Sequence, residues 1–178
     1  PDDDLQRLAD CFKGEYVLDF SEHPEVSHPL PTVALSLRPP WPWVILRPDV
    51  IDPIDRAEMC ATGWIKNIEN RKWPTKFRGP VLIHCSKSFD KDGWYWIKDK
   101  MGLIVPTGQP VGGIVGVVTI TDCVIHSDSP WFFGPYGFVL EDARPLPFMA
   151  CKGTIFPKFW PVEYKALPVP PGDREVAG

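Results

Sequence analysis

The sequence predicts an α+β fold, a single barrel-like domain of four to six short strands with one or two helices. Its 178 residues match the usual size of one domain. The 22 prolines remove backbone hydrogen-bond donors along the chain and disfavour long helices. Short runs rich in β-branched residues are typical of strands. With 44% hydrophobic residues, the chain can form a core, which excludes a wholly disordered protein.

Residues 1–31 are expected to form an extension that precedes this domain. Three aspartates at positions 2–4 can cap a short helix, which Gly14 would end. Residues 15–20 are predicted to be extended. Residues 22–31 contain three prolines and are interpreted as a loop.

The domain itself is expected to span residues 32–160 and to begin with a strand at residues 32–37. The proline-rich stretch 39–43 stops this strand and is predicted to be rigid. A helix is predicted over Pro53–Ala61, because Asp52 can cap it and a proline is favoured in the first turn. Gly63 would end this helix, since glycine tolerates the left-handed conformation.

The remaining elements are predicted mostly as strands. The strongest is residues 112–125, where β-branched residues alternate with small ones, and its internal glycines predict a bend or bulge. We also expect an extended segment at 65–73, strands at 81–84 and 137–141, a helix or lid at 89–101, and a short element at 155–160. From residue 161 to 178 the sequence is interpreted as a proline-rich tail.

The net charge of −4 excludes a protein that coats nucleic acid through bulk charge. Residues 63–87, however, hold six Lys or Arg side chains against one Glu, a local net charge of +5. Trp64, Trp73 and Phe77 are interleaved with these cations, which is the combination that contacts polyanions and stacks on bases. Composition alone favours a simpler interpretation, a solvated strand edge whose lysines prevent aggregation.

Lys66, Glu69 and Arg71 are the candidate ligand-binding residues of this segment. On a plain strand Glu69 and Arg71 share a face and Lys66 points the other way. The three converge only if the backbone turns just after Lys66, as at a helix end that passes into a strand. Together they could hold an anionic or amide-bearing ligand. The alternative is a salt-bridged strand start worth about 0–1 kcal/mol.

Several ordered motifs resemble the ASCH family of the PUA-like superfamily, over residues 32–160. The matching stretches, with the family pattern after each (h is hydrophobic), are Ser36-Leu37-Arg38-Pro39-Pro40-Trp41 (S-x-x-x-P-W), Gly63 followed by Lys66-x-x-Glu69-x-Arg71 (G-x-K-x-x-E-x-R, with one extra residue after Gly), Trp73 to Lys87 (W-x-T-x-x-R-G-x-h-x-I-H-x-S-K), Gly116 to Asp122 (G-x-V-x-h-x-D), and Lys152-Gly153 with Trp160 (K-G…W). The resemblance implies a PUA-like β-barrel with a few flanking helices. It also implies a cleft lined by Lys66, Glu69 and Arg71 that receives RNA, or a base or nucleoside.

The leading hypothesis is therefore a nucleic-acid-binding domain, with RNA favoured over DNA. Besides the Lys66, Glu69 and Arg71 cleft, the candidate contacts are Trp41 or Trp131 as stacking surfaces, Lys76, Arg78 and Lys87 at the backbone, and Ser86 and Lys152. Asp122 could pair with Lys66 or Arg71.

An amidohydrolase is the rival hypothesis, with Lys66 as base or nucleophile and Glu69 relaying a proton. Some small bacterial relatives hydrolyse acetylated cytidine, with the motif Lys and a Thr where this chain has Glu69. A nuclease has weaker support, and a protein-interaction domain that meets an acidic partner is the last alternative.

The five cysteines contain no CxxC pair and lie mostly among apolar neighbours, so they are interpreted as buried, reduced thiols in the cytoplasm. His84 is expected to be a core histidine. We expect no metal and no cofactor, and a monomer. No apolar run approaches the roughly 18 residues that would span a membrane.

Overall fold

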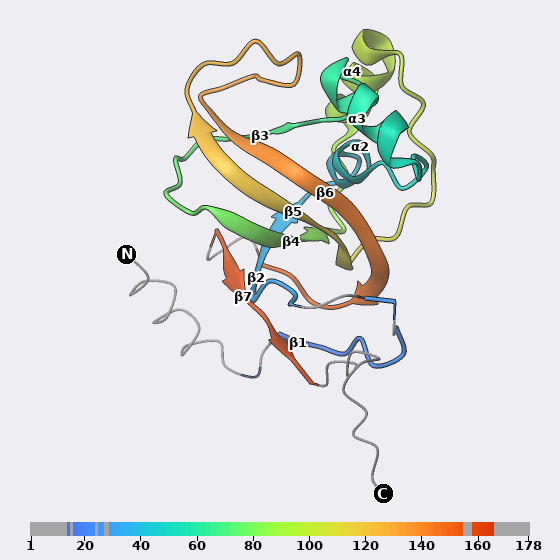
Figure 1. Ribbon diagram of the computed structural model, residues 1–178, viewed down its shortest axis with the longest axis vertical. Helices are drawn as coiled ribbons and strands as arrows, with labels where there is room; N and C mark the ends of the chain where they lie inside the picture. Colours follow the sequence, from blue (N-terminus) through green and yellow to red (C-terminus); the bar gives the residue numbers. More distant parts are fainter. Residues whose placement is uncertain (1–13, 15, 24, 27–28, 155–157, 166–178) are drawn as a thin grey trace, which may run out of the picture.

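The structure, a computed structural model, describes residue 14 and residues 16–23, 25–26, 29–154 and 158–165 (Figure 1). Over these residues the fold is α+β, as predicted, and most of its core is sheet. The expected helix at the N-terminus, residues 155–157 and most of the proline-rich tail lie outside the described residues. The described residues contain no helix that is long and apolar enough to cross a bilayer.

The described elements include three helices and strands of very different length. The helices are α2 (Trp41–Leu46), α3 (Pro53–Ala61) and α4 (Lys91–Met101). The strands are β1 (Val17–Leu18), β2 (Val33–Leu37), β3 (Ile68–Arg71), β4 (Gly79–Cys85), β5 (Gly113–Val124), β6 (Tyr136–Ala150), β7 (Trp160–Pro161) and β8 (Glu163–Tyr164).

Six strands form one sheet in the order β3-β6-β5-β4-β2-β7. The pair β2–β4 is parallel, and the other pairs of this sheet are antiparallel. Within the described residues the two end strands, β3 and β7, do not pair with each other, so the sheet is open. Strands β5 and β6 are long and curved, and they cross the whole sheet (Figure 1). A separate parallel pair is formed by β1 and β8.

The bulge predicted in β5 is confirmed. The register between β5 and β6 shifts between Ile114 and Gly116 and at two further points. At Gly116 a Cβ would lie 2.4 Å from a methyl group of Leu46. The missing side chain therefore lets helix α2 pack closely on the sheet.

Helix α3 has the predicted bounds and the predicted signals. The Asp52 side chain accepts hydrogen bonds from the backbone N–H groups of Ile54 and Asp55, at 2.7 and 3.2 Å. Gly63 follows the helix in the left-handed conformation, with φ +79°. The ambiguous segment 89–101 is a helix, α4, capped by the Asp90 side chain, which accepts from the backbone N–H of Gly93.

Two elements differ from the sequence interpretation. Residues 41–43, which the sequence interpretation described only as part of a rigid stretch, form the first turn of helix α2, because a proline at the second helical position loses no intrahelical hydrogen bond. Strand β6 runs to Ala150 instead of ending near residue 141. Only residues 136–139 pair with β3, so Pro145 and Pro147 lie where that edge of β6 has no partner among the described strands.

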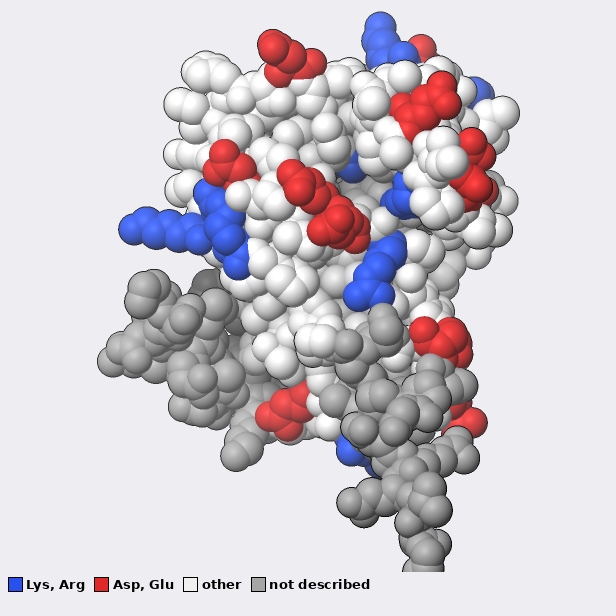
Figure 2. Space-filling model, in the orientation of Figure 1, with Lys and Arg blue, Asp and Glu red and all other residues white. Residues whose placement is uncertain are grey.

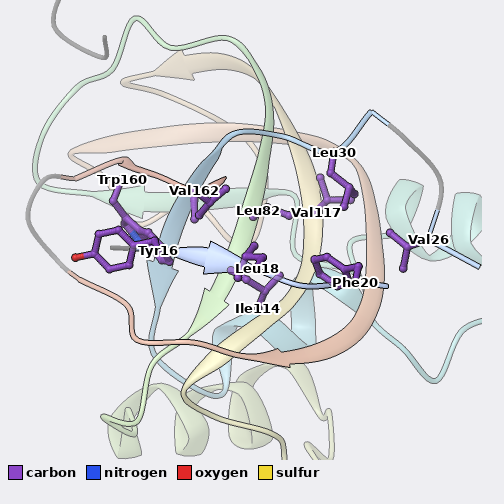
Figure 3. Close-up of a cluster of buried hydrophobic side chains, with 11 residues drawn as sticks. Tyr16, Leu18, Phe20, Val26, Leu30, Leu82, Ile114, Val117, Trp160 and Val162 are labelled. Atoms are coloured by element: carbon purple, nitrogen blue, oxygen red, sulfur yellow. The ribbon is translucent and has the colours of Figure 1, made fainter. Parts of the chain in front are cut away.

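Parts of both flanking segments pack on the sheet. Tyr16, Leu18 and Phe20 are buried together with Trp160 and Val162 against one face (Figure 3). Strand β8 continues from this region and pairs with β1. Segments that the sequence interpretation placed outside the domain therefore contribute to its buried core. Helices α2 and α4 lie on another side of the sheet (Figure 1), where Val44 of α2 and Ile97 of α4 are buried together with Ile68 of β3.

Candidate functional site

A cavity of about 350 Å³ lies between the β2–β4 pair, helix α2 and strand β3. We call it the central pocket. Its lining comprises Ser36, Leu37, Arg38, Trp41, Lys66, Glu69, Asn70, Arg71, Ser86, Asp90 and Phe133. The volume is at the lower end of the range typical of small-molecule sites.

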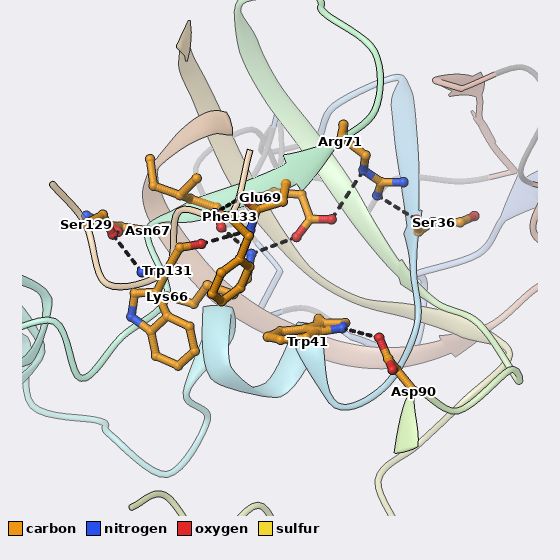
Figure 4. Close-up of polar contacts among 12 residues, drawn as sticks. Ser36, Trp41, Lys66, Asn67, Glu69, Arg71, Asp90, Ser129, Trp131 and Phe133 are labelled. Carbon is orange, nitrogen blue, oxygen red and sulfur yellow. Dashed lines mark hydrogen bonds and ion pairs between the residues drawn. The ribbon is translucent and has the colours of Figure 1, made fainter. Parts of the chain in front are cut away.

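The structure brings Lys66, Glu69 and Arg71 together in this pocket. The backbone N–H of Lys66 donates to the carbonyl of Val44 in helix α2, and strand β3 begins only at Ile68. The backbone thus turns between the helix layer and the strand, as convergence required. The ammonium of Lys66 lies 2.8 Å from Glu69 Oε2, and Arg71 Nε lies 3.2 Å from Glu69 Oε1 (Figure 4). One carboxylate therefore bridges two cations.

Burial sets the electrostatics of this bridge. Lys66 is 2% exposed and Glu69 is 7% exposed, so the pair is not a solvated surface salt bridge. Burial lowers the pKa of the Lys66 ammonium, and the charge and hydrogen bond of Glu69 oppose this shift. The ammonium also donates to the carbonyl of Ile68. Lys66, Glu69 and Arg71, which we call the charged row, have a formal net charge of +1.

Trp41 forms one aromatic wall and is held by Asp90. The indole N–H of Trp41 donates to Asp90 Oδ2 at 2.9 Å, and Arg38 donates to the same oxygen at 3.0 Å. Burial alone would raise the pKa of Asp90, but the hydrogen bonds from the Trp41 indole and the Gly93 N–H and the charge of Arg38 keep it below its usual value. The Lys66 ammonium lies 5.5 Å from the centroid of the Trp41 ring, within cation–π range.

Phe133 forms a second aromatic wall, which sequence reasoning missed. Its backbone N–H donates to Asn70 Oδ1 at 2.7 Å, and Asn70 Nδ2 donates to the carbonyl of Trp131 at 2.8 Å. The Phe133 side chain is half exposed, and its ring centroid lies 6.4 Å from that of Trp41. Phe133 belongs to the aromatic stretch at residues 131–137, but no local signal in the sequence shows which of its rings faces the pocket.

The prediction that Trp131 offers a stacking surface is wrong. Its side chain is fully buried, and its indole N–H donates to the carbonyl of Gly63 at 2.8 Å. It packs beside Val44, Ile68 and Ile97 beneath the helices. Trp131 therefore supports the pocket from inside, and Phe133 takes the exposed place.

The other candidate contacts are dispersed. Ser86 lines the central pocket, and its buried Oγ has no hydrogen-bond partner among the described residues. Lys76 is exposed and is not part of the pocket lining. Lys87 lines two neighbouring cavities, and Lys152 lines one of these, beside His84.

The charged segment 63–87 does not form one continuous basic patch. Lys66 and Arg71 are neutralised in part by Glu69. Arg78 pairs with Asp122 at 2.8 Å, so Asp122 contacts neither Lys66 nor Arg71. On the face of the molecule seen in Figure 2, Lys and Arg side chains are interspersed with Asp and Glu side chains. The cationic character that remains is local.

His84 is a core histidine, as expected. Its Nδ1 lies 3.2 Å from Ser36 Oγ, which donates to the carbonyl of Thr154 and accepts from the Trp160 indole N–H. Because the hydroxyl has a single proton, His84 must donate in this contact. Burial lowers the pKa of His84. A Cβ at Gly153 would lie 2.2 Å from the imidazole, so this glycine closes over the ring.

The cysteines only partly follow the expectation. Cys85 is buried, and burial raises its pKa to about 11, which keeps it a thiol. Cys60 is exposed. It lies on helix α3, which has no buried residue, so its apolar neighbours in the sequence do not bury it. Cys11 lies outside the described residues.

Comparison with protein-family models and with curated proteins gave no match for this sequence. In the described part of the chain, no group of three or more His, Cys, Asp or Glu side chains is arranged to hold a metal ion.

Proposed function

We propose that this chain is an ASCH-like domain that binds nucleic acid, preferentially RNA, by taking a base or a modified nucleoside into the central pocket. The observation that carries the proposal is the buried row of Lys66, Glu69 and Arg71, which opens on a cavity of about 350 Å³ beside Trp41 and Phe133. The same three residues are those that match the motif of the ASCH family.

The chemistry of the pocket suits the edge of a base. The Glu69 carboxylate accepts hydrogen bonds, as ring N–H and amino groups require, whereas Lys66 and Arg71 donate to carbonyl oxygens. Unpaired bases in RNA are recognised by this combination of edge hydrogen bonds and stacking on aromatic rings. Trp41 and Phe133 supply the rings.

The energetic cost of the charged row also favours a binding role. Burying an ion pair costs several kcal/mol per ion in desolvation, so such a pair adds little to stability compared with apolar residues of similar size. Lys66 and Glu69 are both almost fully buried. We attribute their presence to ligand recognition rather than to folding.

We also propose that the curved sheet belongs to a PUA-like barrel. Support comes from the order of the motifs along the chain and from the bulged, strongly curved strands β5 and β6, which are the devices that turn a sheet toward closure.

Amide hydrolysis is less well supported than binding. Lys66 Nζ donates hydrogen bonds to Glu69 and to the carbonyl of Ile68, and the charge and hydrogen bond of Glu69 favour the protonated form against the lowering of the pKa by burial. A nucleophile or base needs the free amine. Incubation with acetylated cytidine, followed by assay of released acetate, should give no turnover above that of a Lys66→Met variant. Turnover above this control would favour the hydrolase.

The binding proposal is tested by titrating a fluorescent single-stranded RNA, the same sequence as DNA, and an RNA duplex, at about 50 and about 200 mM salt. We expect the single-stranded RNA to bind most tightly. Arg71→Gln and Phe133→Ala should each weaken binding about tenfold or more, the loss expected for one charge-assisted hydrogen bond or one stacked base. Lys100→Gln, an exposed lysine outside the pocket, is the control.

Binding that is equal in all three variants would contradict the proposal. So would binding of an acidic polypeptide combined with indifference to nucleotides, which is the result expected of a protein-interaction domain. Circular dichroism spectra of the variants establish that any loss is not due to unfolding.

A further inference from the structure

A second cavity, of about 450 Å³, adjoins the central pocket. We call it the aromatic pocket. At three places in the chain, one residue lines the central pocket and the next residue lines the aromatic pocket. These pairs are Arg38 and Pro39, Ser86 and Lys87, and Asp90 and Lys91. The two cavities therefore lie on either side of these three stretches of backbone, which we call the shared wall.

The aromatic pocket, like the central pocket, contains exposed aromatic rings. Phe89 is 53% exposed and Tyr95 is 47% exposed, although residues of this size are usually buried. Trp94 lies edge-on to Tyr95, with 5.2 Å between the ring centroids. Trp94 and Tyr95 belong to helix α4, so their positions are set before a ligand arrives. Rings presented in this way are stacking surfaces for bases of a single strand.

The charge of the aromatic pocket also differs from that of its neighbour. Lys87 and Lys91 line it, and none of its lining residues is acidic. The stem of Lys87 lies over Gly112, where a Cβ would be 2.7 Å from the lysine Cε. The Lys91 ammonium lies 5.9 Å from the centroid of the Tyr95 ring. Lys87 and Lys91 both belong to the shared wall, and no carboxylate is among the lining residues of the aromatic pocket to offset their charges.

We propose that the aromatic pocket binds the nucleotide adjacent to the one in the central pocket. Its base stacks on Phe89 or Tyr95, and Lys87 and Lys91 contact the phosphate that joins the two nucleotides. This inference rests on the proposed function of the central pocket. The binding site of the domain would then extend over at least two nucleotides of a single strand, with one base in each cavity.

The test is a comparison of ligand lengths by isothermal titration calorimetry. Each of the four ribonucleoside monophosphates and the matching homodinucleotides are titrated into the full chain. We expect dinucleotides to bind at least about fivefold more tightly than mononucleotides, since a stacked base contributes about 1 kcal/mol or more.

The variants Phe89→Ala/Tyr95→Ala and Lys87→Gln/Lys91→Gln should each remove most of this gain. Trp64→Ala, which removes an aromatic ring of similar exposure outside both cavities, and Lys100→Gln should preserve it. All four variants replace exposed or half-buried side chains, and circular dichroism confirms their folding.

The outcomes separate the two proposals. A dinucleotide gain that survives both pocket variants overturns the aromatic subsite and leaves the central pocket in place, as does equal binding of mono- and dinucleotides. Binding that is lost in Phe89→Ala/Tyr95→Ala but unaffected by Arg71→Gln overturns the role of the central pocket. If no nucleotide or dinucleotide binds, both proposals fail.

Discussion

Two polar networks meet at Ser36, and they are built on opposite principles. The Ser36 carbonyl accepts from Arg71 at 2.9 Å and so joins the charged row of the central pocket. The Ser36 hydroxyl contacts His84 and Trp160 and so joins a neutral network inside the sheet. The first network consists of two cations and a carboxylate, whereas the second consists of a hydroxyl, an imidazole and an indole, and each of them borders a cavity.

The difference shows which buried polar groups serve the fold and which require another explanation. Neutral groups need only matched donors and acceptors to be tolerated in a core. Charged groups need an opposite charge as well, and even then they seldom stabilise a protein more than apolar residues would. Removing one partner should therefore damage the charged row far more than the neutral network.

Glu69→Gln is the strongest test of this contrast. Without the carboxylate, the buried Lys66 ammonium and Arg71 lack their counter-charge, and we expect a loss of about 3–5 kcal/mol in the free energy of unfolding. Urea denaturation measures it. Adding Lys66→Met removes the unpaired charge and should restore most of the loss. A Glu69→Gln variant that loses less than about 1 kcal/mol would show that the row is effectively solvated.

Ser36→Ala tests the neutral network and should have a smaller effect. It leaves the Trp160 indole N–H and His84 Nδ1 without their hydroxyl partner, at a cost of about 1–3 kcal/mol. The contact with Arg71 uses the backbone carbonyl and is retained, so nucleotide affinity should change little. A variant of native stability with reduced affinity would reverse the roles assigned to the two networks.

The pH dependence of stability should report on His84. Burial lowers its pKa in the folded protein, so below a pH of about 6.5 the unfolded chain binds the proton more readily. Stability should therefore fall as the pH decreases below this value, by at most about 1.4 kcal/mol per pH unit from this group. Urea denaturation between about pH 7 and pH 5 measures the slope. A His84→Asn variant should show a shallower slope, and an identical slope would contradict the assignment.

Asp122→Asn should have the smallest effect. It removes the partner of Arg78, and both side chains are exposed to solvent. We expect a change of less than about 1 kcal/mol in the free energy of unfolding, and less still at high salt. Urea denaturation in parallel with Glu69→Gln makes it the exposed counterpart of the buried pair. A loss comparable to that of Glu69→Gln would remove burial as the reason for the contrast.

Elements with local signals could be predicted from the sequence. Helix α3 was predicted with its bounds because its cap, its first-turn proline and its terminating glycine lie within a dozen residues. Strand β5 was predicted from its β-branched pattern. Strand β6 was predicted only at its start. Its second half contains prolines, which a strand tolerates only where one of its edges is unpaired, and the sequence does not show that β3 pairs with residues 136–139 alone. The packing of Tyr16 against Trp160 joins residues far apart in the chain and leaves no local trace.

The residues of the candidate site also fall into two groups, those that the sequence indicates and those that it does not. The spacing of Lys66, Glu69 and Arg71 indicated a cluster, although its convergence depended on a turn that only the structure could supply. Asn70 lies within that segment, yet its contact with the loop at residues 131–133 could not be inferred from spacing. Asp90 was hidden because its partners, Arg38 and Trp41, precede it by about fifty residues.

The two hydrogen bonds of Asn70 have a consequence for how a ligand would be received. They tie the Phe133 wall to strand β3, the same strand that carries Glu69 and Arg71. Stacking ring and polar groups are thus fixed to one piece of backbone before any encounter. The entropy of ordering them is lost when the chain folds and not when a ligand arrives, so association should proceed without a slow rearrangement of this wall.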